Sequence, residues 1–340
     1  MSKHKVIDLF CGAGGLSYGF HKAGFETIFG VEFNPVYAKT YKSNFPKTNI
    51  YVGYIKNLND EEVKLLSKEN DVDVIIGGPP CQGFSIAGNI GRRFIDDPRN
   101  ELFKEFFRFV KNIMPKIFVI ENVAALVRHN KGKTISEIIE IFEKLGYKVE
   151  YKILNAVNYE VPQERRRVFI VGTKNNINFS YSKELKNKIS IKDAIDNLPY
   201  LESGQSSKID LHNAMRHTKQ MLEKMKYVKD GGNRNDIPAE IRPKSGDVRK
   251  YIRYSSNEPS VCVTGDMRKI FHYSQNRALT PRELARLQTF PDSYKFVGSS
   301  IAIQQQIGNA VPCNLAYYVA LKCKEALEHE QVPNSKLHRQ

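Results

Sequence analysis

Lys5–Gly15 reads KVIDLFCGAGG, an apolar run that ends in a turn containing three glycines. The run has the character of a buried strand, and the helical pattern LSYGF follows the turn at residues 16–20. Glycines at such a turn let the backbone approach a ligand closely. Gly15 follows Gly14 directly, whereas a dinucleotide-binding fingerprint spaces its last glycine three residues further on, so the stretch disfavours a dehydrogenase. It predicts a strand–turn–helix unit of an α/β fold.

Apolar strands alternate with helical patterns from Lys5 to about Gly172. Several of the strands are almost continuously apolar, as expected when helices cover both faces of a parallel sheet. We therefore predict an α/β fold with a doubly wound, mostly parallel sheet. The expected strands are KVIDLF (5–10), ETIFGVEF (26–33), DVDVII (71–76), IFVIENV (117–123), YKVEYKIL (147–154) and RVFIVG (167–172).

The pattern weakens after Gly172, which indicates a second, irregular module. Residues 208–277 carry 15 Lys and Arg against 8 Asp and Glu. Thr280, Pro281 and Glu283 are typical of a helix start. An apolar helix follows Pro312, and its face of Leu315, Tyr318, Val319, Cys323 and Ala326 must pack against the first domain. We expect a discontinuous domain of residues 1–172 plus 300–340, and a second domain of residues 173–299.

The net charge of +15, from 52 basic and 37 acidic side chains, favours a polyanionic partner such as nucleic acid. A general bias toward lysine is the alternative. Five cysteines without a short paired spacing argue against a disulfide framework and a zinc site, and no apolar run approaches the roughly 20 residues of a membrane span. We expect a protein of the reducing cytosol without a metal.

Polar side chains follow several of the expected strands. Cys81 stands behind two prolines in GGPPCQGFS (77–85), Glu121 and Asn122 close the strand IFVIENV, and Arg165 and Arg167 stand in QERRRVFIVG (163–172), before its apolar run. Carboxyl ends of parallel strands share one edge of the sheet, where open α/β sheets bind ligands. A thiol, a carboxylic acid and two guanidinium groups there would supply a nucleophile, a proton donor and an anion clamp. Packing of Cys81 as a small hydrophobe is the alternative.

In order, the motifs DLFCGAGG (8–15), GGPPCQGFS, ENV (121–123), QERRRVFIVG (163–172), NRALTPRELARLQTFPDSY (276–294) and QIGNAVP (306–312) resemble the cytosine-5 DNA methyltransferase family of bacterial restriction-modification systems. The resemblance covers residues 5–172 and 277–323. It implies the methyltransferase fold that uses S-adenosylmethionine, with S-adenosylhomocysteine as product. Residues 173–299 would be the target-recognition domain.

The resemblance implies a role for each matching residue. Cys81 would attack carbon 6 of a cytosine rotated out of the duplex, Glu121 would donate a proton to ring nitrogen 3, and Asn122 would orient the loop. Arg165, with Arg167 behind it, would hold the cytosine carbonyl or a phosphate. The residues implied to bind the cofactor are Phe10, Gly12, Gly14, Glu32, Phe33, Tyr54, Pro80, Leu102 and Asn309. DNA contacts are expected at Gln82, Ser85, Arg234, Arg242, Arg249, Arg253 and Arg268.

Two positions depart from the family pattern. The family has aspartate, an acceptor for the adenine amino group, where this chain has Tyr54, so Tyr54→Asp is expected to tighten cofactor binding. Threonine is common in the family at or near Cys262. Tyr54 keeps open the alternative of a non-catalytic DNA-binding relative, and a transfer RNA cytosine methyltransferase is another alternative. We expect a monomer of the bacterial cytosol that acts at the nucleoid on double-stranded DNA, with a restriction endonuclease of the same site as a further partner.

Overall fold

The structure is a computed structural model that describes residues 4–80, 100–174, 176–243 and 250–330. The chain forms two compact units. The first contains Met1–Leu154, Arg166–Lys183 and Leu315–Gln340, and the second contains Asn155–Arg165 and Glu184–Asn314. Residues 300–314 therefore group with the second unit, although the sequence analysis placed them in the catalytic domain. The functional division into catalytic and target-recognition domains stays a prediction.

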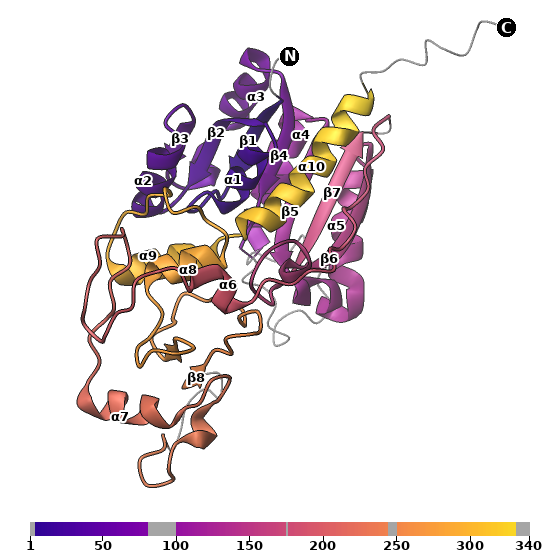
Figure 1. Ribbon diagram of the computed structural model, residues 1–340. Helices are drawn as coiled ribbons and strands as arrows, with labels where there is room; N and C mark the ends of the chain where they lie inside the picture. The colour runs from indigo at the N-terminus through magenta and orange to yellow at the C-terminus, as the bar shows by residue number, and fades with distance from the viewer. Residues whose placement is uncertain (1–3, 81–99, 175, 244–249, 331–340) are drawn as a thin grey trace, which may run out of the picture. The chain divides into compact units, whose positions relative to one another are not determined.

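A seven-stranded sheet of order β3-β2-β1-β4-β5-β7-β6 forms the centre of the first unit (Figure 1). Neighbouring strands from β3 to β5 pair in parallel, and β7 runs antiparallel to β5. The predicted mostly parallel sheet is confirmed. The strands are β1 (Lys5–Leu9), β2 (Glu26–Glu32), β3 (Asn49–Val52), β4 (Val72–Gly77), β5 (Ile117–Val123), β6 (Tyr147–Asn155) and β7 (Arg166–Lys174). The sequence analysis missed β3, which has four residues and no buried side chain.

The strand order reverses between β1 and β4, because the chain runs outward through β2 and β3 and then returns to β4 on the other side of β1. Open α/β sheets bind ligands at the carboxyl ends of the strands that flank such a reversal. The loops that leave β1 and β4 begin at Phe10 and Gly78. The topology therefore brings the glycine turn and the proline loop to the same edge of the sheet.

Helices of the first unit pack against the sheet in two groups. Phe103, Phe106 and Phe109 of α4 and Phe142 of α5 join a buried cluster with strand residues such as Phe118. α1 packs on α10 through Gly19, where a Cβ would lie 2.4 Å from the Cβ of Ala316. The helices are α1 (Gly15–Lys22), α2 (Pro35–Asn44), α3 (Asp60–Glu69), α4 (Glu101–Ile113), α5 (Lys133–Glu143) and α10 (Cys313–Glu330), with 3-10 turns η1 (Ile55–Asn57) and η5 (Ala124–Gly132).

The C-terminal helix α10 buries four of the five residues expected on its apolar face. Leu315, Val319, Cys323 and Ala326 are at most 3% exposed, and Tyr318 is half-buried. Its interior position explains why this segment completes the first unit although more than 100 residues separate it from β7. None of the helices in the described part of the chain is both long and apolar enough to cross a membrane.

The second unit contains little regular structure, as expected from its polar sequence. Its apolar centre includes Met225, Val228, Ile237 and Phe271. The predicted helix start at Thr280 is confirmed, since Thr280 and Glu283 form a capping box. Its elements are η6 (Ala156–Asn158), α6 (Ile191–Ile195), α7 (Lys219–Tyr227), η7 (Arg234–Asp236), β8 (Ile252–Arg253), β9 (Ile270–Phe271), α8 (Pro281–Leu287) and α9 (Ser300–Asn309).

Candidate functional site

The glycine turn after β1 is joined to the end of β2 through Glu32. One carboxylate oxygen of Glu32 accepts the N–H of Gly12 at 2.8 Å, and the other accepts the N–H of Asn34 at 2.7 Å. Gly12 and Gly14 have φ of +54° and +89°, conformations that glycine adopts without strain. Burial raises the pKa of Glu32, and the backbone N–H groups oppose that shift. Glu32 thus fixes the shape of the turn and lies where a ligand hydroxyl could reach it.

Two exposed aromatic rings stand beside this turn. Phe33 and Tyr54 are 56% and 54% exposed, and their ring centroids lie 4.5 Å apart at an angle of 42°. The Lys56 ammonium lies 5.8 Å from the centre of the Tyr54 ring. Large exposed rings that do not pack into a core suit a flat ligand that stacks on them. Phe10 and Leu102 are half-buried and pack against the apolar cluster of the first unit.

The proline loop after β4 is held by the end of β5. The Asn122 side-chain amide donates to the carbonyl oxygen of Pro79 at 3.0 Å, and a Cβ at Gly78 would lie 3.1 Å from Oε2 of Glu121. Pro79 is buried and Pro80 is exposed. The carboxyl group of Glu121 therefore lies against the first residue of the loop that leads to Cys81.

Arg167 is the basic partner of this acid. Its Nε lies 3.0 Å from Oε1 of Glu121, and the two side chains are 16% and 13% exposed. The contact follows from the sheet, since β5 and β7 pair with Glu121 opposite Phe169 and Val123 opposite Arg167. Neighbouring strands thus place the two side chains on one diagonal of the sheet.

Three predicted residues, Cys81, Gln82 and Ser85, lie outside the described residues. Two of the described cysteines, Cys11 and Cys323, are poor nucleophiles. Burial raises the pKa of Cys11 and of Cys323, so both stay thiols at neutral pH. Cys262 is partly exposed, and its sulfur accepts a hydrogen bond from Arg165 at 3.3 Å.

Arg165 has different neighbours from those expected. Its guanidinium is buried in the second unit and donates to the carbonyl oxygens of Val263, Gly308 and Ala310 at 2.8–3.1 Å. These contacts therefore do not support the expected anion clamp, in which Arg165 and Arg167 act together. Arg167 carries the contact to the acid, whereas Arg165 joins two backbone segments, at Val263 and at Gly308–Ala310, and the second of these contains the exposed Asn309.

Gln163 and Gln288 extend this junction around Arg165. Gln163 donates to Oε1 of Gln288 at 2.9 Å and accepts the N–H of Val263 at 2.8 Å, and both glutamines are fully buried. Gln288 donates in turn to the carbonyl oxygen of Ile307. A Cβ at Gly308 would lie 2.3 Å from the carbonyl carbon of Thr264, so this packing requires glycine. The sequence analysis missed both glutamines, although each of them stands in a quoted motif.

Most of the described arginines expected at DNA are used inside the second unit. The Arg253 guanidinium donates five hydrogen bonds, to Met225, Val228, His272, Gln275 and Asn276. The residue is 5% exposed, which argues against a DNA contact. Arg242 donates to the carbonyl oxygens of Ile237 and Asn235, and Arg234 donates to that of Pro243. Arg249 lies outside the described residues. Arg268 is exposed and pairs with Asp266 at 2.8 Å.

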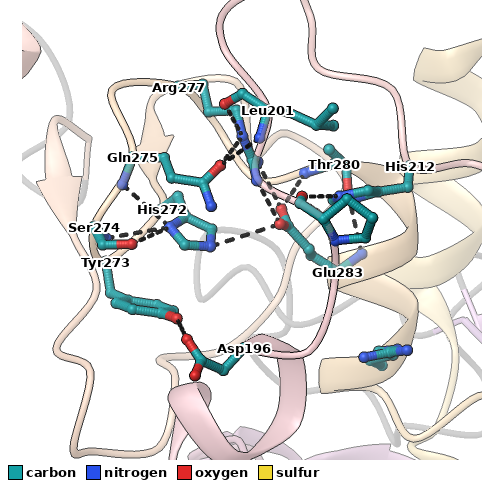
Figure 2. Close-up of polar contacts among 12 residues, drawn as sticks. Asp196, Leu201, His212, His272, Tyr273, Ser274, Gln275, Arg277, Thr280 and Glu283 are labelled. Atoms are coloured by element: carbon teal, nitrogen blue, oxygen red, sulfur yellow. Dashed lines mark hydrogen bonds and ion pairs between the residues drawn. The ribbon is translucent and has the colours of Figure 1, made fainter. Parts of the chain in front are cut away.

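A buried polar cluster fixes the segment before α8, as Figure 2 shows. Arg277 and Glu283 form two hydrogen bonds, 2.6 and 2.8 Å long, between fully buried groups. Nδ1 of His272 accepts two backbone N–H groups, which leaves the proton on Nε2, 3.6 Å from Glu283. Burial lowers the pKa of His272 to about 4, so it is neutral near pH 7. This cluster is a folding element rather than an open site.

A second cluster missed by the sequence analysis lies beneath the glycine turn. Asp8 is 1% exposed and accepts a hydrogen bond from Ser17 at 2.6 Å, and Ser17 is bonded to the Tyr41 hydroxyl at 2.7 Å. Burial raises the pKa of Asp8 to about 7 against the opposing Ser17 hydrogen bond. The sequence did carry a signal for this cluster, because Asp8 is a charged residue inside the apolar run KVIDLF.

Comparison with known proteins gives one consistent family. The family model of C-5 cytosine-specific DNA methylases matches residues 4–325. The Type II methyltransferase M1.HphI of Haemophilus parahaemolyticus is 56% identical over 315 residues, which span 92% of this chain and 85% of that protein. The Type II methyltransferase M.NgoFVII of Neisseria gonorrhoeae is 36% identical over 327 residues, 92% of this chain and 84% of that protein.

Solved structures agree with this family. A crystal structure described as a prophage-encoded DNA modification methyltransferase of E. coli superposes with a TM-score of 0.79 at 26% identity, over 96% of this chain and all of that one. The Entamoeba histolytica methyltransferase EhMeth, at 18% identity and a TM-score of 0.67, shares the fold over 96% of this chain and 99% of its own. The chain therefore belongs to the C-5 cytosine-specific DNA methylases and is a methyltransferase enzyme.

Proposed function

We propose that the protein methylates carbon 5 of a cytosine in a short duplex DNA site through a transient bond to Cys81, as the modification enzyme of a Type II restriction-modification system in the bacterial cytosol. Relatives at 56% and 36% identity bear the name Type II methyltransferase, which supports the modification role. A net charge of +15 suits a polyanionic substrate. A restriction endonuclease of the same site is the partner that this role implies.

The observation that carries the proposal is the packing of Glu121 against Gly78, with Asn122 bonded to Pro79 and Arg167 bonded to Glu121. Cys81 follows Pro79 by two residues, so the chain itself keeps the thiol within a short reach of the acid. A nucleophile, an acid and a cation at one ligand-binding sheet edge are what this reaction needs. The same three groups would have no joint use in a protein that binds DNA without modifying it.

The chemistry follows from the electron-poor cytosine ring. The Cys81 thiolate forms a bond from sulfur to carbon 6, the electrons of the 5,6 double bond move into the ring, and nitrogen 3 takes a proton from Glu121. Carbon 5 is then nucleophilic enough to take the methyl group from a sulfonium donor, whose sulfur keeps the electrons of the broken bond and leaves as a neutral thioether. A base next removes the proton from carbon 5, the 5,6 double bond re-forms as the bond from sulfur to carbon 6 breaks, nitrogen 3 returns its proton to Glu121, and the thiolate is restored. Because the target carbon is stacked within the duplex, the base must first rotate out, at a cost of a few kcal/mol.

The first unit offers groups that fit S-adenosylmethionine, the sulfonium compound that supplies the methyl group. Glu32 is fixed by two backbone N–H groups beside the turn and suits the ribose hydroxyls. Phe33 and Tyr54 offer exposed rings to an adenine. Phe10, Gly12, Gly14, Pro80 and Leu102 would line the remainder of this site in the first unit. Asn309 belongs to the second unit, and its role toward the cofactor stays a prediction.

Covalent trapping tests the proposal directly. Bisulfite sequencing of DNA from cells that express the protein first defines the methylated site. Duplex DNA carrying 5-fluorocytosine at that site should then become covalently linked to the protein when S-adenosylmethionine is present, because fluorine cannot be removed as a proton. The Cys81→Ala protein should form no adduct. The matched Cys262→Ala protein, which loses a different and partly exposed thiol, should still form it.

The same preparations separate the alternatives. Methylation of transfer RNA without methylation of duplex DNA would replace the substrate proposed here. DNA binding with no methylation of either nucleic acid would identify a non-catalytic relative. An adduct that survives in Cys81→Ala would overturn the assignment of the nucleophile while leaving the methyltransferase assignment intact.

A further inference from the structure

A pocket of about 360 Å³ in the second unit has no role in the chemistry described above. Its lining combines Met215 and Met221 with several basic residues. The lining residues are Met215, Arg216, His217, Thr218, Met221, Lys250, Asp266, Arg268 and Lys269. The sequence analysis singled out Arg268 among these residues, and the structure adds its neighbours.

Short backbone elements bring these cations together. β8 and β9 pair in parallel, so Lys250, two residues before β8, and Lys269, directly before β9, lie at the same end of the pair. The N–H of Tyr251 donates to the carbonyl oxygen of Lys269 at 2.8 Å and fixes that register. α7 also begins at the pocket, with Thr218 as its N-cap. The segments that begin β8, β9 and α7 thus bring cationic side chains and backbone N–H groups to one pocket.

His217 adds a neutral donor to this set. Its Nε2 accepts the backbone N–H of Ala278 at 3.0 Å, so a neutral His217 carries its proton on Nδ1. Burial lowers the pKa of His217, and the Arg277 charge lowers it further, so the ring is neutral near pH 7. The lining therefore contains four cationic side chains and a fixed N–H donor, a set that suits an anion or an acceptor-rich base edge.

Asp266 is the one carboxylate among the lining residues that the structure describes. Its two oxygens lie 3.2 Å from the Lys250 ammonium and 2.8 Å from Nε of Arg268. Arg268, followed by Lys250, lowers the pKa of Asp266, so this carboxylate is charged at neutral pH. All three side chains are 37–55% exposed, and solvent-exposed ion pairs of this kind exchange partners at little cost.

We propose that this pocket is a contact point for target DNA, in which Asp266 holds Lys250 and Arg268 in the DNA-free protein and yields them to DNA. The proposal rests on the proposed function, since it names part of the DNA-binding surface of that enzyme. The ligand is an acceptor group of duplex DNA, either a phosphate oxygen or the N7 and O6 edge of a guanine. Arg253, Arg242 and Arg234 do not compete for this role because their guanidinium groups are bonded to backbone carbonyl oxygens, whereas Arg268 pairs with the exposed carboxylate of Asp266.

Binding of duplex DNA to the full-length protein, measured by fluorescence anisotropy at several salt concentrations, tests the pocket. The Lys250→Ala/Arg268→Ala double variant should weaken binding by about fivefold or more at low salt. The matched Lys208→Ala variant, which removes an exposed lysine of the same unit that does not line the pocket, should change binding less than twofold.

Asp266→Asn gives the opposite and more specific result. Removing the carboxylate frees both cations, so binding of duplex DNA should tighten by about threefold or more at low salt, and the gain should fade as salt rises. An Asp266 that merely supports the fold would weaken binding when replaced. Melting temperature and S-adenosylmethionine binding of each variant, expected unchanged, show that the fold is intact.

The outcomes separate the two DNA groups and the two proposals. Equal weakening on target and non-target duplexes assigns the pocket to phosphate, and loss confined to the target site assigns it to a base edge; both results support the pocket. Unchanged binding in the double variant, or weaker binding in Asp266→Asn with an intact fold, overturns it while the methyltransferase proposal stands. DNA binding that responds as expected in a protein that never methylates cytosine would overturn the proposed function alone.

Discussion

Arg167 and Glu121 form an ion pair with 3.0 Å between Nε and Oε1, largely shielded from solvent and next to the loop that carries Cys81. The pair joins the end of β5 to the start of β7. It therefore fixes the acid by two neighbouring strands rather than by a loop. An acid held in this way can keep one position relative to a bound base.

This pair predicts a graded loss of catalysis. Glu121→Gln should lower kcat about 10²- to 10⁴-fold, the usual range for a lost acid, while duplex DNA binding changes little. Arg167→Lys should lower kcat about 10-fold or more, because an ammonium lacks the guanidinium fork that holds the carboxylate. Steady-state methyl transfer to the mapped DNA site provides both numbers. Equal kcat for Glu121→Gln and the unchanged protein would remove Glu121 from the mechanism.

Arg165 should behave differently from Arg167 because its guanidinium bonds to backbone oxygens inside the second unit. Arg165→Met leaves three buried carbonyl groups without this donor, which should lower the free energy of unfolding by about 3 kcal/mol. Chemical denaturation of Arg165→Met and Arg167→Met, side by side, measures the difference. Loss of kcat without loss of stability in Arg165→Met would instead place Arg165 at the reacting base.

Tyr54 tests the departure from the family pattern. Tyr54→Asp is expected to tighten S-adenosylmethionine binding, because a carboxylate is a stronger acceptor than a phenol for an adenine amino group. Tyr54→Phe keeps the ring contact with Phe33 and serves as the matched control. Isothermal titration of the DNA-free protein gives both affinities. Weaker binding in Tyr54→Asp with unchanged binding in Tyr54→Phe would show that the ring, rather than an acceptor, serves the ligand.

Asp8 predicts a pH dependence of stability. Its pKa rises from 3.8 when the chain is unfolded to about 7 when it is buried, so between these values the folded state keeps a proton that the unfolded state loses. Stability should therefore fall as pH rises from about 4 to 7, by an amount on the order of a few kcal/mol. Asp8→Asn should lack this part of the decline. Denaturation at pH 5 and pH 8 measures it, and identical slopes in both proteins would show that Asp8 is ionised in the folded state.

His272 contributes to the same window with the opposite sign. Burial lowers its pKa from 6.5 to about 4. At a pH between these two pKa values the unfolded state binds a proton that the folded state does not bind, so the free energy of unfolding rises with pH. The comparison of Asp8→Asn with the unchanged protein isolates the Asp8 contribution, because His272 is present in both. A steeper rise of stability with pH in the variant is the signature to seek.

The sequence was sufficient for the architecture of the first unit. Near-continuous apolar runs are buried between two layers of helices, and the strands β1, β2, β4, β5 and β7 follow those runs closely. β6 also lies where it was expected, although most of its residues are not buried. The sequence analysis missed the short strand β3 because its four residues, two half-buried and two exposed, form no hydrophobic period. Edge residues such as Glu32 and Glu121 were also readable, because a polar residue that closes an apolar strand must lie at the rim of the sheet.

Tertiary structure decided which polar group meets which. Arg165 and Arg167 look equivalent in the chain, but a strand neighbour gives Arg167 an acid, and the surrounding backbone of the second unit gives Arg165 carbonyl oxygens. In the same way, the Arg253 guanidinium donates hydrogen bonds inside the second unit, whereas Arg268 lies at the surface and pairs with Asp266. Sequence determines where apolar surface must be buried, because burial is a property of each side chain. The partner of a buried charge depends on contacts between distant segments, and only the folded chain supplies those.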